Sequence, residues 1–435
     1  MVNDGQLNRK TAKGNQGARK VISVDLQRLL ERFLDYVAID TTANDATDRY
    51  PSSDGQWELG RLVVRQLEQI GLADIDQDEH GLVWATVPPS IPSGASTIAF
   101  NAHLDTSPEA SGANVKPQVI RDYRGGDIPL PGDPAQRIRV AENPELDRLH
   151  GATLVTTDGT TLLGGDDKAG VAVIVETAAC LMEHPEIPHG PIRLLFTCDE
   201  EIGRGVKHVD LEKLGAAACY TLDGDGADKI DVETFSADLA AVTIHGVNIH
   251  PSIAKGRMVN AVRAASHFVA RLPRDVLAPE ATDGRQGFVH PYQIEGGVAR
   301  VVLKVLLRDF DTPKLGEQAD LLHRIAKEVE ADFPGAQIAV EITRQYRNLA
   351  EGLAKEPRAV RYVQQAYERL GRAVRLATVR GGTDGSVLTE RGLPTPNLST
   401  GQHNPHSTLE WVCLNEMGAA VELLIELAQV WAEST

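Results

Sequence analysis

The sequence predicts an α/β protein in which a mixed central sheet is flanked by helices and a smaller α+β unit is inserted. Three observations lead to this prediction. Amphipathic helical patterns alternate with short apolar runs over most of the chain, and three of those runs end in acidic residues. Between residues 231 and 345 the pattern changes to alternating strand-like segments and two helices. We therefore expect a main domain formed by residues 25–230 and 346–435, with residues 231–345 as a self-sufficient inserted domain.

The composition restricts the classes of protein and partner. The chain has 435 residues, 42% of them hydrophobic and 24% charged, which is typical of a globular protein with two or three domains. Its net charge of −17 argues against nucleic acid as a partner, because phosphate binding needs a basic surface. No apolar run approaches the roughly 18 residues that span a bilayer, so no membrane partner is expected.

The N-terminal segment bears on targeting, and the cysteines bear on the redox environment of the protein. Residues 1–24 are polar and basic, without the apolar stretch of a secretory signal, and we expect them to form a disordered head. Wide spacing of the cysteines predicts buried, reduced thiols in a cytoplasmic protein. These cysteines are Cys180, Cys198, Cys219 and Cys413.

The main domain begins with two helices, two strands and a long excursion. Apolar residues spaced by three and four predict helices over residues 25–37 and 55–70, and alternation predicts strands over 82–86 and 97–101. Residues 109–160 are rich in Gly, Pro and Asp and are predicted to be a long excursion with short strands. An excursion of this length inside a compact domain is often functional.

The apolar run at residues 192–197 is predicted to be the strand around which the sheet is organised. A helix over residues 168–183 precedes it, and a strand over 216–222 follows. The remaining predicted elements are strands at 240–245, 296–307 and 338–342, helices at 260–272 and 315–333 in the inserted domain, and main-domain helices at 358–370 and 414–433.

Acidic groups at the carboxyl ends of strands meet in the crevice where open α/β sheets bind ligands. His103 and Asp105 lie two residues apart at such an end, which suits a metal-binding imidazole and a carboxylate that orients it. The glycines before Asp166 would let a metal approach its carboxylate. Glu200 and Glu201 point to opposite sides of an extended chain, so one could bind a cation while the other transfers a proton. Each feature alone is also common as a solvated turn, a hydrogen-bonded pair or a helix cap.

Together the candidates form a set of two imidazoles and three carboxylates that can bind two divalent ions, with one carboxylate bridging them. Such ligands without a thiolate fit Zn²⁺, with Mn²⁺ or Co²⁺ as substitutes, whereas Mg²⁺ and Ca²⁺ would not recruit two histidines. Such a site activates water and polarises a carbonyl, and Glu200 would carry the proton to the leaving amine, so the predicted reaction is amide hydrolysis. The predicted ligands are His103, Asp166, Glu201, Asp223 and His406.

These motifs resemble those of the tripeptide aminopeptidases (peptidase T) of the M20 metallopeptidase family. The resemblance covers residues 26–432, and the order, spacing and neighbours of the motifs all agree with it. The motifs are His103-Leu104-Asp105-Thr106-Ser107, Gly164-Gly165-Asp166-Asp167-Lys168, Asp199-Glu200-Glu201-Ile202-Gly203, Asp223-Gly224, Arg380-Gly381-Gly382-Thr383-Asp384-Gly385 and His406.

The resemblance implies a zinc-exopeptidase-like main domain and a role for each candidate. Asp166 would bridge two zinc ions, one also bound by His103 and Asp223 and the other by Glu201 and His406. Asp105 would be the carboxylate behind the metal ligands, and Glu200 the general base.

The inserted domain is implied to be a lid through which the protein forms a homodimer. His250 would stabilise the oxyanion, in some relatives from the partner subunit. Asn260 and Arg380 would hold the terminal carboxylate of the substrate, a task for which a planar guanidinium is suited. The alternative to these roles is that His250 is a plain turn residue and that Arg380 forms a structural salt bridge.

The 24-residue head has no counterpart in the family pattern, and alternatives remain at two single positions. Cys198 stands where the family has a proline, and we expect it to pack inward rather than bind metal as a thiolate. His403 competes with His406 as a ligand, and His406 is preferred because Glu410 follows it by four residues, as in the family.

The expected function is a cytoplasmic dinuclear zinc aminopeptidase that releases the N-terminal residue from short peptides, chiefly tripeptides. Two alternatives remain at this point. One is another M20-like amidohydrolase that acts on dipeptides or N-acyl amino acids. The other is a catalytically inactive binding protein that metal ions stabilise.

Overall fold

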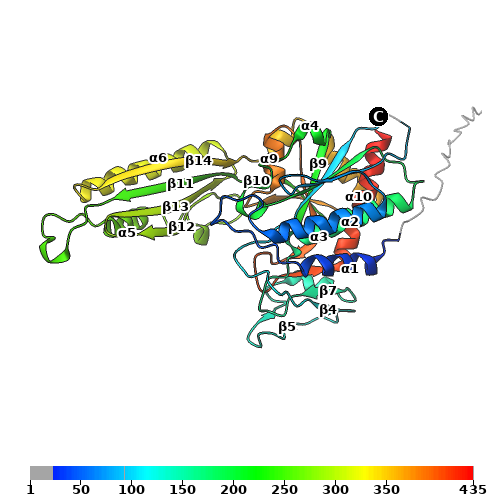
Figure 1. The fold of residues 1–435 in the computed structure, drawn as a ribbon, viewed down its shortest axis with the longest axis horizontal. Coiled ribbons are helices and arrows are strands. Elements are labelled where there is room, and N and C mark those ends of the chain that lie inside the picture. Colours follow the sequence, from blue (N-terminus) through cyan, green and yellow to red (C-terminus); the bar gives the residue numbers. More distant parts are fainter. Residues whose placement is uncertain (1–22, 93, 435) are drawn as a thin grey trace, which may run out of the picture.

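The computed structural model describes residues 23–92 and 94–434, and it contains a large sheet covered by helices and a smaller sheet beside it (Figure 1). Residues 1–22 of the predicted disordered head lie outside the described residues. Within the described ranges, no helix is both long and apolar enough to cross a bilayer. All four cysteines are free and buried, as the sequence predicted.

The large sheet is mixed, which confirms the predicted fold class. Its strands follow the order β1-β2-β8-β3-β9-β16-β17-β7-β4, and β10 and β15 join at the side of β16. β3 pairs in parallel with both β8 and β9, so the carboxyl ends of these three strands meet at one edge. The strands are β1 Ala73–Gln77, β2 Val83–Val87, β3 Ile98–His103, β4 Gln118–Ile120, β7 Leu154–Thr156, β8 Ile192–Thr197, β9 Ala218–Asp225, β10 Lys229–Thr234, β15 Arg375–Val379, β16 Asn397–His403 and β17 Trp411–Cys413.

Helices cover both faces of this sheet. Five of them (α1, α2, α3, α8 and α10) share one core with it, and α4 and α9 border a smaller core on the other face. The helices outside the inserted unit are α1 Leu26–Val37, α2 Asp54–Ile70, α3 Gly165–Glu183, α4 Leu211–Leu214, α7 Ala350–Leu353, α8 Arg358–Arg369, α9 Asp384–Glu390 and α10 Leu414–Glu433.

Helix α3 lies in the middle of the first core, between the sheet and the outer helices. Its residues from Lys168 to Leu181 are all buried, which explains why it is apolar on every side. Asp166 and Asp167 have non-helical backbone angles, so the regular helix begins at Lys168, as predicted. The Asp167 carboxylate accepts hydrogen bonds from the backbone of Gly170 (3.2 Å) and of His103 (3.1 Å) and so fixes the start of the helix beside β3.

The second sheet is antiparallel, in the order β12-β13-β11-β14, and extends away from the main domain as a long, narrow unit (Figure 1). Two helices pack on one face of this sheet and share its core. The opposite face is not covered by these helices. Its elements are β11 Ser236–His245, α5 Ala261–Arg271, β12 Phe288–Gly296, β13 Arg300–Asp309, α6 Pro313–Asp332 and β14 Gln337–Tyr346.

Several strands were missed by sequence reasoning, and β12 shows why. It is an edge strand, it contains Pro291, and most of its residues are partly or fully exposed. An edge strand with proline has no buried-to-exposed alternation to detect. β1, β10, β15 and the helix α9 were also not predicted.

The predicted excursion forms an arm, defined here as residues 109–156, with a small apolar core of its own. It contains β4, β5 (Ile128–Pro129), β6 (Arg137–Ile138), a 3₁₀ turn (Pro144–Arg148) and β7. Trp411 of β17 is buried in the same core. The arm is therefore packed against the segment that follows β16.

Asp231 gives the stability of the fold a predictable dependence on pH. This β10 residue is 4% exposed, and Asn397 donates a hydrogen bond to it (3.0 Å). Burial raises the pKa of Asp231 to about 6. The folded protein therefore binds this proton more tightly than the unfolded chain, whose Asp pKa is about 4, and stability falls as pH rises between these two values.

We expect Asp231→Asn to stabilise the protein by about 2 kcal/mol at pH 7.5 and by little at pH 4, because the amide keeps the bond from Asn397 without a buried charge. Urea unfolding at the two pH values measures this difference. Asp238→Asn, a buried acid paired with Arg347 at 2.8 Å, serves as the control and should destabilise at pH 7.5. A pH-independent effect of Asp231→Asn would contradict the prediction.

Candidate metal centre

Five side chains that are far apart in the sequence come together at the edge where β3, β8 and β9 end. They form two groups, each with one ligand atom per residue within 4.8 Å of the others. His103, Asp166 and Asp223 form one group, and Asp166, Glu201 and His406 form the other. All five predicted ligands are therefore in the cluster, and Asp166 belongs to both groups.

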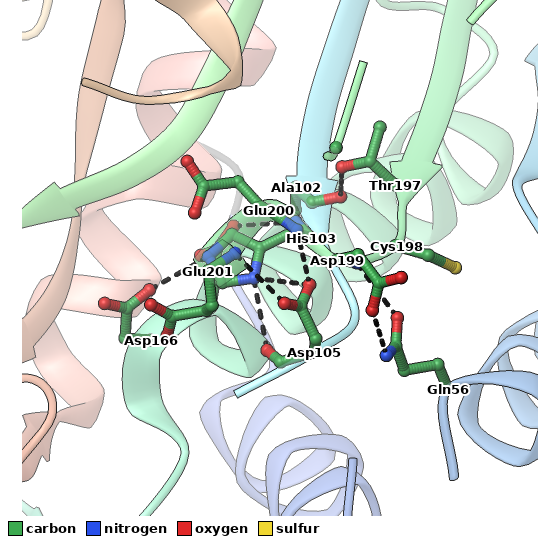
Figure 2. Close-up of polar contacts among 12 residues, drawn as sticks. Gln56, Ala102, His103, Asp105, Asp166, Thr197, Cys198, Asp199, Glu200 and Glu201 are labelled. Atoms are coloured by element: carbon green, nitrogen blue, oxygen red, sulfur yellow. Dashed lines mark hydrogen bonds and ion pairs between the residues drawn. The ribbon is translucent and has the colours of Figure 1, made fainter. Parts of the chain in front are cut away.

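The carboxylate of Asp166 faces the two histidines with different oxygen atoms. Its Oδ1 lies 3.0 Å from Nε2 of His103, and its Oδ2 lies 3.3 Å from Nε2 of His406. Nε2 of His103 is also 3.8 Å from Asp223 Oδ1, and Nε2 of His406 is 2.9 Å from Glu201 Oε2. Figure 2 shows His103 and Asp166 joined in this way beside Glu201. A carboxylate placed between two imidazoles is the arrangement that a bridging ligand needs.

The cluster concentrates negative charge away from water. Burial raises the pKa of Asp223 well above its usual range, with the charge of Asp166 adding to the effect, and burial raises that of Glu201 to about 7. Burial alone would raise the pKa of Asp166, but hydrogen bonds with His103 and His406 outweigh it and hold that pKa below its usual range. Burial lowers the pKa of His406, but the hydrogen bonds to Asp166 and Glu201 raise it more. The result is a pKa of about 11.

These residues fit a pair of divalent cations. Oε1 of Glu201 is buried without a hydrogen-bond partner among the described residues, and a buried carboxylate oxygen needs one. Three clustered carboxylates repel one another unless protons or cations compensate them. Imidazole and carboxylate ligands without a thiolate are suited to Zn²⁺. Cys198 lies in neither group, and its Sγ contacts the carbonyl oxygen of Gly81 at 3.6 Å.

Asp105 holds two parts of the site in place from behind. It is fully buried, and its two carboxylate oxygens accept hydrogen bonds from the backbone N–H groups of Glu200 and Glu201, both at 3.0 Å. Its Oδ1 and its carbonyl oxygen lie 3.4 and 3.1 Å from Nδ1 of His103 (Figure 2). The sequence predicted its partnership with metal ligands but not its hold on the Glu200–Glu201 turn.

The turn after β8 presents two acids in different directions. Asp199 has a left-handed backbone (φ 60°), and its carboxylate accepts hydrogen bonds from Ser52 N (2.8 Å) and Gln56 Nε2 (2.7 Å). Figure 2 shows the side chains of Glu200 and Glu201 leaving the turn on different sides. Burial, with a contribution from Asp223, raises the pKa of Glu200 well above its usual range. Sequence reasoning gave Asp199 no role, although its place in a run of three acids was a signal.

Glu410 supports the backbone that carries Asp166. It is 1% exposed, and its carboxylate accepts hydrogen bonds from the N–H groups of Leu163 (2.7 Å), Gly164 (2.7 Å) and Asp166 (2.9 Å). In the sequence it served only as a landmark for His406. The competing candidate His403 lies outside both ligand groups.

The three predicted substrate-binding residues lie outside both ligand groups. They are His250, Asn260 and Arg380. Arg380 donates hydrogen bonds to the carbonyl oxygens of Thr282, Gly284 and Gln286 at 2.8–3.3 Å, so it forms backbone contacts rather than a salt bridge. Asn260 caps α5 through its Oδ1. His250 is exposed in the loop between β11 and α5, which lies at the far end of the inserted unit (Figure 1).

Arg308 is a cation that sequence reasoning missed. It lies on the face of β13 turned away from the helices, and its Nη1 contacts the hydroxyl of Tyr346 at 2.5 Å. Its Nε is buried without a hydrogen-bond partner in the part of the chain that the structure describes. Burial raises the pKa of Tyr346 to about 12, although the nearby charge of Arg308 opposes this effect. Its position in an alternating strand was the available signal.

Comparison with known proteins gives a consistent assignment. The model of peptidase family M20/M25/M40 matches residues 156–430. A protein named peptidase T from Geobacillus thermodenitrificans is 41% identical over 409 residues, which cover 94% of this chain and 99% of the relative.

Solved structures show the same relationship. The crystal structure of an aminopeptidase from Bacillus cereus has a TM-score of 0.71 and 25% identity and covers 94% of this chain and 99% of its own. A dinuclear metal-binding M20 peptidase from Bacillus subtilis shares the fold, with a TM-score of 0.62, 16% identity and coverage of 94% and 99%. The resemblance predicted from the motifs is confirmed, and the chain belongs to peptidase family M20 and, within it, to the peptidase T group.

Proposed function

We propose that the protein is a dinuclear zinc aminopeptidase that releases the N-terminal residue from short peptides, chiefly tripeptides, in the cytoplasm. The observation that carries this proposal is the carboxylate of Asp166, which presents one oxygen to each of two histidines. The similarity to peptidase T and to a protein described as an aminopeptidase supports the reaction.

In this proposal, His103, Asp166 and Asp223 hold one Zn²⁺ and Asp166, Glu201 and His406 hold the other, with Mn²⁺ or Co²⁺ as substitutes. The bound ions supply Lewis acidity that activates water and polarises the scissile carbonyl. Two ions are supported by the similarity in fold to a dinuclear metal-binding peptidase and by Glu201 Oε1, which has no hydrogen-bond partner within residues 23–92 and 94–434.

Glu200 is proposed as the general base that accepts a proton from water and returns it to the leaving amine. A carboxylate with a raised pKa is suited to this exchange near neutral pH, and burial raises the pKa of Glu200. Asp105 accepts hydrogen bonds from the backbone N–H groups of Glu200 and Glu201, and these bonds fix the backbone from which the Glu200 side chain projects.

Arg308 adds a further candidate for the terminal carboxylate of the peptide. Arg308 is half-buried, and its Nε, which has no hydrogen-bond partner among the described residues, would gain most from a carboxylate that can accept two hydrogen bonds. Arg380 and Asn260, proposed from the family resemblance, would first have to release their present partners. His250 would serve a second copy of the chain in a homodimer formed through the inserted unit, and its exposed position is compatible with that role.

We expect Glu200→Gln to lower kcat by about 10³-fold or more, because a general base contributes typically 10²–10⁴-fold, while zinc content stays near two ions per chain. Glu201→Gln is the matched control and should lose affinity for one ion. Steady-state kinetics and elemental analysis of the same samples distinguish the two roles. Turnover by Glu200→Gln at the wild-type rate would refute the assignment of the base.

The substrate assignment is tested with a panel of small amides. Enzyme stripped of metal by a chelator should be inactive, and Zn²⁺, Mn²⁺ or Co²⁺ should restore hydrolysis. Tripeptides with a free amino terminus should be the best substrates and should release their first residue, as identified by mass spectrometry. Preference for dipeptides or N-acyl amino acids would favour a different amidohydrolase, and metal binding without hydrolysis would favour a binding protein.

The role of Arg308 predicts a substrate-dependent effect. We expect Arg308→Met to raise KM for a tripeptide by about 10–100-fold, the loss expected from a charged hydrogen bond of roughly 1.5–3 kcal/mol. The matching tripeptide amide, which has no terminal carboxylate, should change little. Lys304→Met, on the same face of β13, is the control. Equal losses for the acid and the amide would show that Arg308 supports the structure only.

A further inference from the structure

The loop that carries His406 has a backbone that needs support from elsewhere. Asn404 and His406 both have left-handed backbone angles, with φ of 51° and 59°. A residue other than glycine in such a conformation costs of order 1–3 kcal/mol and persists where its surroundings hold it in place. The position of the His406 imidazole therefore depends on contacts made by the neighbouring residues.

His403, the last residue of β16, makes contacts on three sides. Its ring stacks on the indole of Trp411, with centroids 3.7 Å apart and an angle of 2° between the planes. Its Nε2 lies 2.8 Å from Glu416 of α10, and its Nδ1 lies 3.5 Å from Glu145 of the arm. The side chain is 7% exposed, so these contacts are largely shielded from water.

These contacts close the loop at both of its ends. His403 precedes the loop and Trp411 follows it, so the stacked rings join the two strands from which it emerges. Burial lowers the pKa of His403, but the hydrogen bonds to Glu145 and Glu416 raise it above its usual range.

The arm contacts the loop at two further points. Nδ2 of Asn404 donates a hydrogen bond to Oδ1 of Asn143 (2.8 Å), and Oγ1 of Thr408 donates one to Oε1 of Gln136 (2.7 Å). His403 therefore acts within a set of contacts that ties the loop to the arm and to α10.

We propose that His403 is a positioning residue that sets the affinity of the ligand group Asp166, Glu201 and His406 for its ion. By joining Trp411, Glu145 and Glu416, it fixes the loop so that Nε2 of His406 stays opposite Asp166 and Glu201. The inference rests on the proposed function only for the assumption that the cluster binds two ions. His103 and Asp223 lie on β3 and β9, outside the loop, so the first ion should be unaffected.

Zinc titration of the full-length, metal-stripped protein by calorimetry tests this inference. For His403→Phe, which keeps a stacking ring but removes both hydrogen-bonding nitrogens, we expect affinity for one ion to fall about 10–100-fold, as for the loss of other groups that support metal ligands. Affinity for the other ion should stay within about threefold. Excess Zn²⁺ should restore most of kcat. His189→Phe, at a buried histidine bound to the carbonyl of Gly190, is the matched control and should leave both ions unchanged.

Glu416→Gln provides a second variant if His403→Phe does not fold, because the amide oxygen can still accept from Nε2. Glu416→Gln should lower the affinity for the same ion by a smaller factor. If the affinities for both ions are unchanged, or fall equally, the proposed role of His403 is wrong. The proposed function remains intact in that case, provided that the wild type binds two ions. A wild type that binds fewer than two ions overturns both proposals.

Discussion

The buried carboxylate of Asp105 is the contact on which the geometry of the site depends. One acid accepts the backbone N–H groups of both Glu200 and Glu201 and contacts Nδ1 of His103. Hydrogen bonds to a carboxylate are about twice as strong as those between neutral groups. Asp105 therefore links the imidazole at the end of β3 to the turn after β8 that carries both acids.

The same construction recurs around the cluster, since each ligand-bearing segment is held by a side chain from elsewhere. Glu410 accepts hydrogen bonds from the backbone that leads into Asp166. Ser52 and Gln56 donate hydrogen bonds to Asp199 at the start of the turn after β8. His403 and the arm hold the loop with His406 in a similar way. Loops that are fixed by distant partners keep ligands in position without the regular hydrogen bonds of a helix or strand.

Charge links the two parts of the molecule. Acids gathered at the strand ends need cations, and a guanidinium on the open face of the inserted unit needs an anion. A short peptide beside two metal ions would satisfy both demands, because its scissile carbonyl and its terminal carboxylate lie only a few bonds apart.

The sequence by itself determined the elements with strong periodicity and the acids at the strand ends. The helix over residues 414–433 and the regular start of α3 at Lys168 were predicted within a residue, because local apolar spacing specifies them. His103, Glu201 and Asp223 were found because parallel strands end at a common edge of the sheet, whereas Asp166 was selected from the glycines beside it and His406 from the family resemblance. Their motifs were also enough to predict the family.

Only the tertiary structure decided which side chains meet. The sequence preferred His406 over His403 only from the spacing of Glu410, and the structure shows that His406 reaches the cluster while His403 pairs with Glu145 and Glu416. The sequence likewise did not reveal that Arg380 donates hydrogen bonds to carbonyl oxygens, or that Arg308 Nε has no partner in the part of the chain that the structure describes. Hydrogen-bond partners more than 90 positions apart, such as Asp105 and Glu200, follow from the packing of whole elements, for which local sequence carries no signal.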